Sequence, residues 1–317
     1  MRQQDYAPRP AHIKWLLDSD PTIRWQVMRD LSDETPDAIA AERARVATEG
    51  WGAKLLAQQS PAGDWGGGSK WDLVALWTLV VLKDLGLDPG SKEARKMIGR
   101  VDKGLVFKRL NNRPFLHGET EPCINGRILG VGSYFKEPND ALAKQLVGEQ
   151  LEDGGWNCEA PKSRRSSFHT TICVLEGLLA YERAGRTSAA VTKARMRAEQ
   201  YLLERGMFRS LRTGKVIDKR WLRFTYPTFW HYDVLRGLDY LRDAGIKPDD
   251  VRPDSRVDEA IEVVIERRHQ NGRWPLNLLH PEEIPLKMET EVGRASRWNS
   301  LRALRVLRWY NESARQA

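Results

Sequence analysis

The chain has 317 residues, of which 41% are hydrophobic and 30% are charged, so it can bury a sizeable core. It has no run of about 18 apolar residues and no apolar segment near its start, so we expect neither a transmembrane helix nor a secretory signal. Three scattered cysteines are too few for a disulfide framework, which favours a cytoplasmic protein. The net charge of +8 makes the chain moderately basic, and its 12 tryptophans are its most unusual feature.

The first predicted elements are two short helices, at residues 13–17 and 22–31. Between them Asp20 precedes Pro21, an order typical of a helix N-cap followed by the first helical residue. We therefore expect an N-terminal helical pair within residues 11–50.

From residue 51 to about residue 311 the chain has a repeating pattern. An amphipathic helical stretch is followed by a polar or glycine turn and an aromatic residue, most clearly at Trp65, Trp156 and Trp274. More apolar helices, with apolar residues at i, i+3, i+4 and i+7, are predicted at residues 71–85, 123–135, 169–184, 231–243 and 298–310. A period of about 45 to 65 residues is typical of repeat architectures. The pattern predicts an all-α protein of paired helices, with turn tryptophans packed between the pairs.

The tryptophan turns, such as Gln150 followed by Gly-Gly-Trp156, resemble the QW repeats of triterpene cyclases such as squalene–hopene cyclase. They are also similar to the glycine-aromatic repeats of protein prenyltransferase β subunits. The resemblance covers residues 51 to 310 approximately. It implies an (α/α) toroid of about six helical hairpins, with residues 1–317 forming one domain and inner helices lining a central cavity.

Polar residues stand at the starts of the predicted inner helices. Cys123 and His169 occupy the same repeat position on neighbouring inner helices, and Glu121 lies two residues before the cysteine. Zinc accepts these three ligand types, and its catalytic sites use three protein ligands. Glu121-Pro-Cys123 also resembles the Asp-x-Cys pair of prenyltransferase β subunits, whose zinc is completed by a histidine on a later inner helix. The predicted cofactor is therefore zinc, with Glu121, Cys123 and His169 as ligands.

Other assignments stay open at this point. His117-Gly-Glu119 resembles an earlier segment of the same β subunits, which gives a second possible register. Cys158 could enter the site from a loop, although it is not among the predicted ligands. Without a metal, Cys123 and His169 could form a thiolate–imidazolium pair.

Further site residues are predicted at the next inner helix. His231 or Tyr232 could donate or accept a proton, and Asp233 could orient His231. Aromatic residues near equivalent repeat positions predict an apolar cavity suited to a hydrocarbon or a flat ring. The predicted pocket residues are Trp71, Phe168, Trp230 and Trp298.

Several function classes are disfavoured by missing motifs. The Asp-x-Asp-Asp cluster of squalene cyclases is absent, because the nearest strings, at residues 249–250 and 254–258, lie in a polar connector. No Asp-Asp-x-x-Asp box and no recognised nucleic-acid module is present. The basic segment 205–223 could attract an anionic substrate or be a solvated rim.

These observations favour an enzyme over a binding protein. We expect a metal-dependent transferase or hydrolase, not a classical triterpene cyclase, acting on a small apolar or amphipathic molecule that could be anionic or isoprenoid-like. The alternative is a non-catalytic binding or interaction module that retains only the toroid scaffold.

Overall fold

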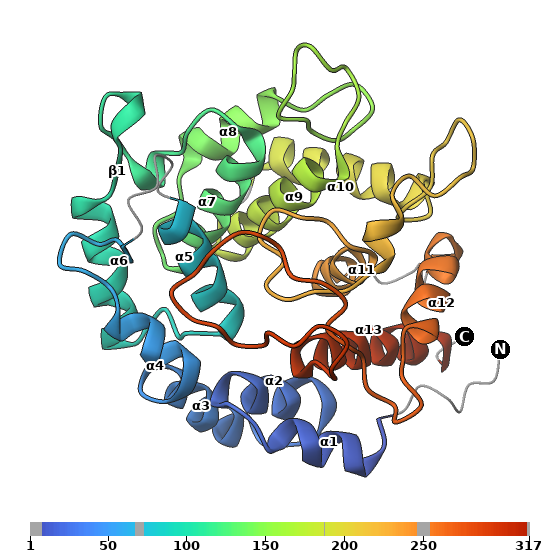
Figure 1. Ribbon diagram of the computed structural model, residues 1–317. Coiled ribbons are helices and arrows are strands. Elements are labelled where there is room, and N and C mark those ends of the chain that lie inside the picture. The colour runs from blue at the N-terminus through green and yellow to red at the C-terminus, as the bar shows by residue number, and fades with distance from the viewer. Residues whose placement is uncertain (1–7, 67–72, 187, 246–253, 316–317) are drawn as a thin grey trace.

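The computed structural model describes residues 8–66, 73–186, 188–245 and 254–315 of the chain (Figure 1). The described residues are mostly helical, and their only strands are the short antiparallel pair β1 (Val106–Phe107) and β2 (Arg113–Pro114). The predicted all-α fold is therefore confirmed.

The helices form a ring within a ring (Figure 1). The inner helices are α2 (Pro21–Leu31), α5 (Leu73–Leu85), α7 (Pro122–Tyr134), α9 (Phe168–Arg183), α11 (Val234–Asp243) and α13 (Arg297–Arg315). The outer helices are α1 (Pro10–Leu17), α3 (Pro36–Ala44), α4 (Gly50–Ala57), α6 (Lys92–Gly104), α8 (Asp140–Gly148), α10 (Ala189–Glu204) and α12 (Asp258–Glu266). Short 3₁₀ turns cover Arg45–Ala47, Lys108–Leu110, Phe115–His117, Lys219–Leu222 and Ser255–Val257. This arrangement is an (α/α) toroid.

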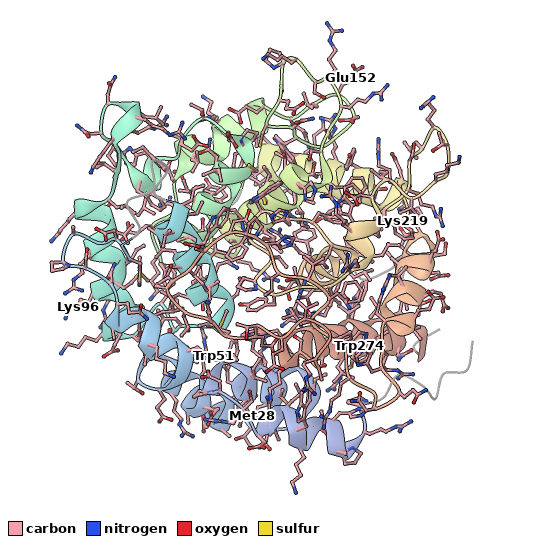
Figure 2. The ribbon with its side chains drawn as sticks, viewed as in Figure 1. Met28, Trp51, Lys96, Glu152, Lys219 and Trp274 are labelled. Atoms are coloured by element: carbon pink, nitrogen blue, oxygen red, sulfur yellow. The ribbon has the colours of Figure 1, made fainter. Side chains whose placement is uncertain are left out.

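The N-terminal helices close the ring. On α2, the indole of Trp25 donates a hydrogen bond to the carbonyl of Leu85 at the end of α5, at 2.9 Å. On the other side, Arg305 of α13 donates to the side-chain oxygen of Gln26 at 3.0 Å. Both ends of the chain therefore contribute to one ring, and side chains occupy much of its interior (Figure 2).

The three turn tryptophans make the same hydrogen bond. Each indole donates to the carbonyl ten residues earlier, on the preceding outer helix, at 2.6 to 2.7 Å: Trp65 to Leu55, Trp156 to Leu146, and Trp274 to Val264. All three indoles are buried, as the sequence predicted. Each bond ties a turn to its own outer helix and satisfies a carbonyl in the last turn of that helix.

The glutamine before the turn links one repeat to the next. Gln150 donates from Nε2 to the carbonyls of Gly154 and of Ala194, both at 2.7 Å. Because Ala194 belongs to α10, this one amide connects the turn after α8 to the neighbouring outer helix. Gln59 makes the equivalent pair of bonds, to Gly63 and to Met97 of α6.

None of the described helices combines the length and the apolar character needed to cross a membrane.

Candidate functional site

Close contact between α7 and α9 positions the start of α7. A Cβ added to Gly126 would lie 2.5 Å from the backbone oxygen of Cys173, and a Cβ on Gly177 would collide with the carbonyl of Gly126. The two backbones therefore touch where both helices carry glycine. This contact fixes the first turn of α7, which carries Cys123, relative to the first turn of α9.

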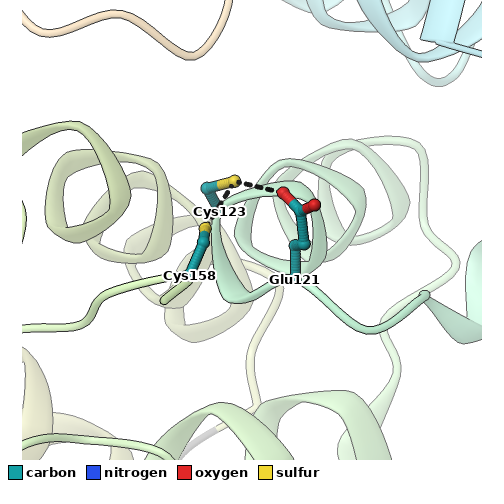
Figure 3. Close-up of side chains that lie close together, drawn as sticks. All are labelled: Glu121, Cys123 and Cys158. Atoms are coloured by element: carbon teal, nitrogen blue, oxygen red, sulfur yellow. Dashed lines mark hydrogen bonds between the residues drawn. The ribbon is translucent and has the colours of Figure 1, made fainter. Parts of the chain in front are cut away.

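Two cysteines and a carboxylate meet at the head of the ring, the end at which the inner helices begin (Figure 3). Cys123 lies in the first turn of α7, and Cys158 comes from the loop after Trp156. Their sulfur atoms are 2.9 Å apart, and both thiols are free. The Cys123 sulfur is 3.6 Å from Oε2 of Glu121, and the Cys158 sulfur is 3.4 Å from the hydroxyl of Thr170.

The two thiols differ in acidity. Hydrogen bonding to Cys123 and to Thr170 outweighs burial and lowers the pKa of Cys158. The shared hydrogen bond with Cys158, together with burial, raises the pKa of Cys123. Of the two thiols, Cys158 is therefore the one that ionises more readily. A thiolate is the form of cysteine that binds metals.

The donor set fits a zinc ion. One oxygen of Glu121 and the two sulfurs lie within 4.8 Å of one another. With zinc–sulfur bonds of about 2.3 Å, tetrahedral geometry places two sulfurs about 3.8 Å apart. The two thiols would have to separate by roughly 1 Å, which a loop residue such as Cys158 can supply. Two sulfurs and one oxygen leave a fourth position open.

His169, the third ligand predicted from the sequence, lies outside this group of three residues. Its Nδ1 accepts a hydrogen bond from the backbone N–H of Tyr232 at 2.8 Å. Burial, with the charges of His231 and Arg236, lowers the pKa of His169 to about 4. The other ring nitrogen, Nε2, lies 3.4 Å from the indole N–H of Trp221, so both ring nitrogens face N–H donors of the protein. The structure brings Cys158, and not His169, close to Glu121 and Cys123.

A second polar cluster, comprising His231, His280 and Glu282, lies on the other side of the first turn of α9. Nε2 of His231 is 2.9 and 3.1 Å from the two oxygens of Glu282, and the indole of Trp230 donates to the same carboxylate. The rings of His231 and His280 stack with centroids 3.6 Å apart and planes 5° from parallel. Lone pairs in two parallel rings cannot both point at one ion between them. The geometry fits a histidine–carboxylate pair better than a metal site.

Sequence reasoning missed His280 and Glu282. Both lie in the long segment between α12 and α13, which passes across the ring (red in Figure 1). Burial and the neighbouring His231 lower the pKa of His280 to about 3, so that ring is neutral. The sequence feature that could have indicated these two residues is the string His280-Pro-Glu282, in a segment longer than the corresponding turns of the other repeats.

The side chains of Tyr232 and Asp233, which were also predicted to be catalytic, make hydrogen bonds to the protein backbone. The hydroxyl of Tyr232 donates to the carbonyl of Met207 at 2.6 Å. Asp233 caps α11 by accepting from the N–H of Arg236 at 2.7 Å, and burial raises the pKa of its carboxyl. Neither side chain is hydrogen-bonded to His231. The prediction that Asp233 orients His231 is corrected, because Glu282 does so.

The predicted aromatic pocket is not a single site. Phe168 is buried against Trp221 and Tyr232, with ring centroids 4.7 and 5.0 Å away, and Trp230 stacks on His231 at 3.9 Å. Trp71 lies outside the described residues, and Trp298 lines a separate cavity of about 900 Å³.

Half of the residues that line that cavity are charged, and five aromatic residues line it as well: Trp25, Tyr134, Tyr226, Tyr240 and Trp298. At its floor, Glu176 of α9 forms ion pairs with Arg127 and Arg236. Burial alone would raise the pKa of Glu176, but the two arginines outweigh it and lower the pKa to about 2. The apolar pattern of the inner helices therefore surrounds a charged layer.

Several residues of the second register and of the basic segment make polar contacts within the protein. Glu119 is buried and accepts from Arg109 at 2.5 Å and from the N–H of Glu121 at 2.9 Å, whereas His117 is exposed. Along residues 205–223, Arg209 pairs with Glu259 and Arg220 pairs with Asp218. Lys219 marks this segment at the periphery of the molecule (Figure 2).

Comparisons with known proteins are limited. No protein-family model and no curated protein matches this chain. A crystal structure of a protein from Actinoplanes is similar at 16% identity and a TM-score of 0.44, covering 96% of this chain and 90% of that one. A type II terpene cyclase variant from Scytonema, in complex with its substrate geranylgeranyl dihydroxybenzoate, is similar at 13% identity and a TM-score of 0.43, covering 97% and 98%. Neither similarity is high enough to assign a family or an activity.

Proposed function

We propose that this protein is a zinc-dependent enzyme whose reaction centre lies at the head of the ring. The observation that carries the proposal is the convergence of Glu121, Cys123 and Cys158 within 4.8 Å. They come from the residue before α7, the first turn of α7 and the loop after α8. Two thiols and a carboxylate that converge from separate segments fit a catalytic zinc site with one open position better than a purely structural core.

His231 is the group best placed to handle a proton. Its Nε2 donates to the Glu282 carboxylate, which leaves Nδ1 as the basic nitrogen of the ring. Glu282 holds that tautomer and stabilises the imidazolium that forms when Nδ1 takes up a proton. Within the described part of the chain, this is the histidine with a carboxylate partner at the head of the ring.

The first turn of α9 links the two groups. Thr170 contacts the Cys158 sulfur at 3.4 Å, and the adjacent His169 ring lies edge-on to His231, with centroids 5.9 Å apart. A bound zinc ion would supply electrophilic chemistry, by polarising a carbonyl, activating water or holding a substrate thiolate. The protein's own part is to orient the substrate beside Trp221 and Trp230 and to move a proton at His231. We propose a transferase or hydrolase that acts on a small amphipathic molecule.

Elemental analysis of the purified protein, loaded with zinc under reducing conditions, tests this assignment. We expect about one zinc per chain in the native protein, and loss of that zinc in Cys123→Ser and Cys158→Ser. Cys173→Ser is the matched control, because this buried cysteine of α9 belongs to neither cluster and should leave zinc in place.

His169→Asn separates the proposed ligands from the triad predicted by sequence. It should retain zinc, because His169 is not a ligand in the structure. A native protein without zinc, or a Cys158→Ser variant that is folded by circular dichroism and still holds stoichiometric zinc, would overturn the assignment.

A further inference from the structure

The cavity of about 900 Å³ lies toward the tail of the ring, the end opposite the thiol pair. Its walls are the later turns of α2, α5, α7 and α9 and one face of α11 and α13. On α7, Cys123 marks the head and Tyr134 lines the cavity, and a helix rise of about 1.5 Å per residue puts about 16 Å between them. The cavity is therefore separate from the proposed zinc site.

Positive charge dominates the lining. Nine basic side chains line the cavity: Arg29, Arg43, Lys83, Lys136, Arg183, Arg186, Arg236, Arg302 and Arg305. Four acidic side chains accompany them: Asp84, Glu176, Asp239 and Asp243. A concave site with a low-dielectric wall and one dominant sign of charge concentrates ions of the opposite sign.

Three of these cations have no carboxylate partner. Within the described residues, Arg43, Lys136 and Arg183 take part in no ion pair. Arg43 donates instead to the carbonyl of Gly86 at 2.9 Å and to the hydroxyl of Tyr134 at 3.0 Å, which are neutral acceptors. The charges of these three side chains are therefore available to a ligand.

The floor of the cavity is fixed and also basic. Arg236 holds Glu176 with two hydrogen bonds of 2.8 Å, and Arg127 binds the same carboxylate. Arg305 and Arg302 share Asp239, at 2.7 and 3.6 Å. More than one arginine thus faces each floor carboxylate, and breaking such buried networks is costly. The floor is rigid, and the exposed Lys136 and Arg183 form a rim.

Three buried donors in the lining lack acceptors. Ser133 Oγ, Tyr226 Oη and Trp298 Nε1 have no hydrogen-bond partner among the described residues, although their residues are only 4%, 5% and 2% exposed. Burial raises the pKa of Tyr226, so its hydroxyl keeps its proton and can donate. The rings of Tyr226 and Trp298 stack at 4.1 Å and form one wall. Buried donors normally have an acceptor, and a ligand with several oxygens would supply it.

We propose that this cavity binds a small organic oxyanion, a polycarboxylate or a phosphate ester, with at least two negative charges. Water could satisfy the three orphan donors, but it would leave Arg43, Lys136 and Arg183 without a negatively charged partner. The oxygens of an oxyanion would accept hydrogen bonds from the three donors and would also balance the positive charge. The ligand would lie between the rim cations and Arg236, with its flat parts against the Tyr226–Trp298 wall. The volume matches metabolite-sized ligands. The proposal does not depend on zinc or on catalysis.

Isothermal titration calorimetry with citrate and with inorganic pyrophosphate, on the reduced protein without zinc, tests the proposal. Citrate represents the carboxylate class and pyrophosphate the phosphate class. We expect saturable binding of one anion per chain by at least one probe, weakening as sodium chloride is added. The probe that binds more tightly identifies the class. No binding of either probe at low salt would overturn the proposal.

Three variants locate the binding. The rim double variant Lys136→Gln/Arg183→Gln should weaken the affinity by about tenfold or more, because two charge-assisted contacts are lost. Tyr226→Phe, which keeps the cavity shape, should weaken it severalfold. Arg220→Gln is the control, because Arg220 is exposed, pairs with Asp218 and lies outside the cavity lining. Equal weakening in the Arg220 and rim variants, or no change in the rim and Tyr226 variants, would place the anion elsewhere.

Discussion

The contact between α7 and α9 gives a quantitative prediction from two glycines on one helix. Gly126→Ala places its Cβ 2.5 Å from the oxygen of Cys173 and 2.7 Å from its carbonyl carbon, both on the α9 backbone. Gly130→Ala places its Cβ 3.5 Å from the nearest atom, the Cα of Gly177, which is an ordinary contact. Both changes occur inside α7, so both gain the same helix propensity, about 1 kcal/mol.

The difference between the two variants therefore measures the packing alone. Helix α9 must move by about 1 Å to accept the methyl group that Gly126→Ala adds, and overpacking of this kind costs about 1–3 kcal/mol. We expect Gly126→Ala to be less stable than Gly130→Ala by that amount, measured as the free energy of unfolding in urea. The displacement should also weaken zinc binding, because it moves Thr170 and its neighbours away from Cys158. Equal stability of the two variants would show that the helices are not in backbone contact.

Three further predictions concern the head of the ring and the turns. His169 has a pKa of about 4 in the folded protein against 6.5 ordinarily, so the stability it contributes is complete above pH 6.5 and is lost as the pH falls to 4. Between those values the native protein should lose up to about 3 kcal/mol more unfolding free energy than His169→Asn, and equal losses would contradict the assigned environment. Trp156→Phe should cost about 1–3 kcal/mol in thermal or urea unfolding, because the carbonyl of Leu146 loses its donor, and a smaller change would show that water replaces it. Mild oxidation of the zinc-free protein should join Cys123 to Cys158, seen by peptide mass spectrometry as the loss of two hydrogens, and bound zinc should prevent it; linkage to Cys173 instead would contradict the geometry.

The helical repeat was readable from sequence because it depends on local signals. Apolar residues at helical spacing predict the inner helices, and the tryptophan after a glycine turn predicts the packing between repeats. What sequence did not show is why tryptophan is needed: in Trp65, Trp156 and Trp274 the indole N–H reaches a carbonyl ten residues earlier. That contact depends on how the turn folds back.

The candidate site was only partly predictable, because its members come from loops as well as from helices. Glu121 and Cys123 were found because they stand at the start of a repeat helix. Cys158 could not be placed from the sequence, because only the folded loop brings its sulfur to 2.9 Å from that of Cys123. His169 was predicted as a ligand because repeat position does not show which partner takes its nitrogen.

The charged cavity was missed for a different reason. Arg236, Arg302 and Arg305 lie on helices that otherwise look apolar, and a long arginine in an apolar pattern is easily assigned to the rim of a helix. The structure instead directs them inward, where Glu176 and Asp239 hold them. The sequence feature that could have indicated the charged cavity is the pair of arginines at i and i+3 within one inner helix, Arg302 and Arg305.

X-ray absorption at the zinc edge tests the proposed metal centre most directly. The zinc-loaded protein should show two sulfur neighbours at about 2.3 Å and oxygen neighbours near about 2.0 Å, from Cys123, Cys158 and Glu121. The His169→Asn variant should retain zinc and show the same two sulfur neighbours. A spectrum without sulfur, or one dominated by imidazole nitrogen, would place the metal at histidine residues and contradict the assignment.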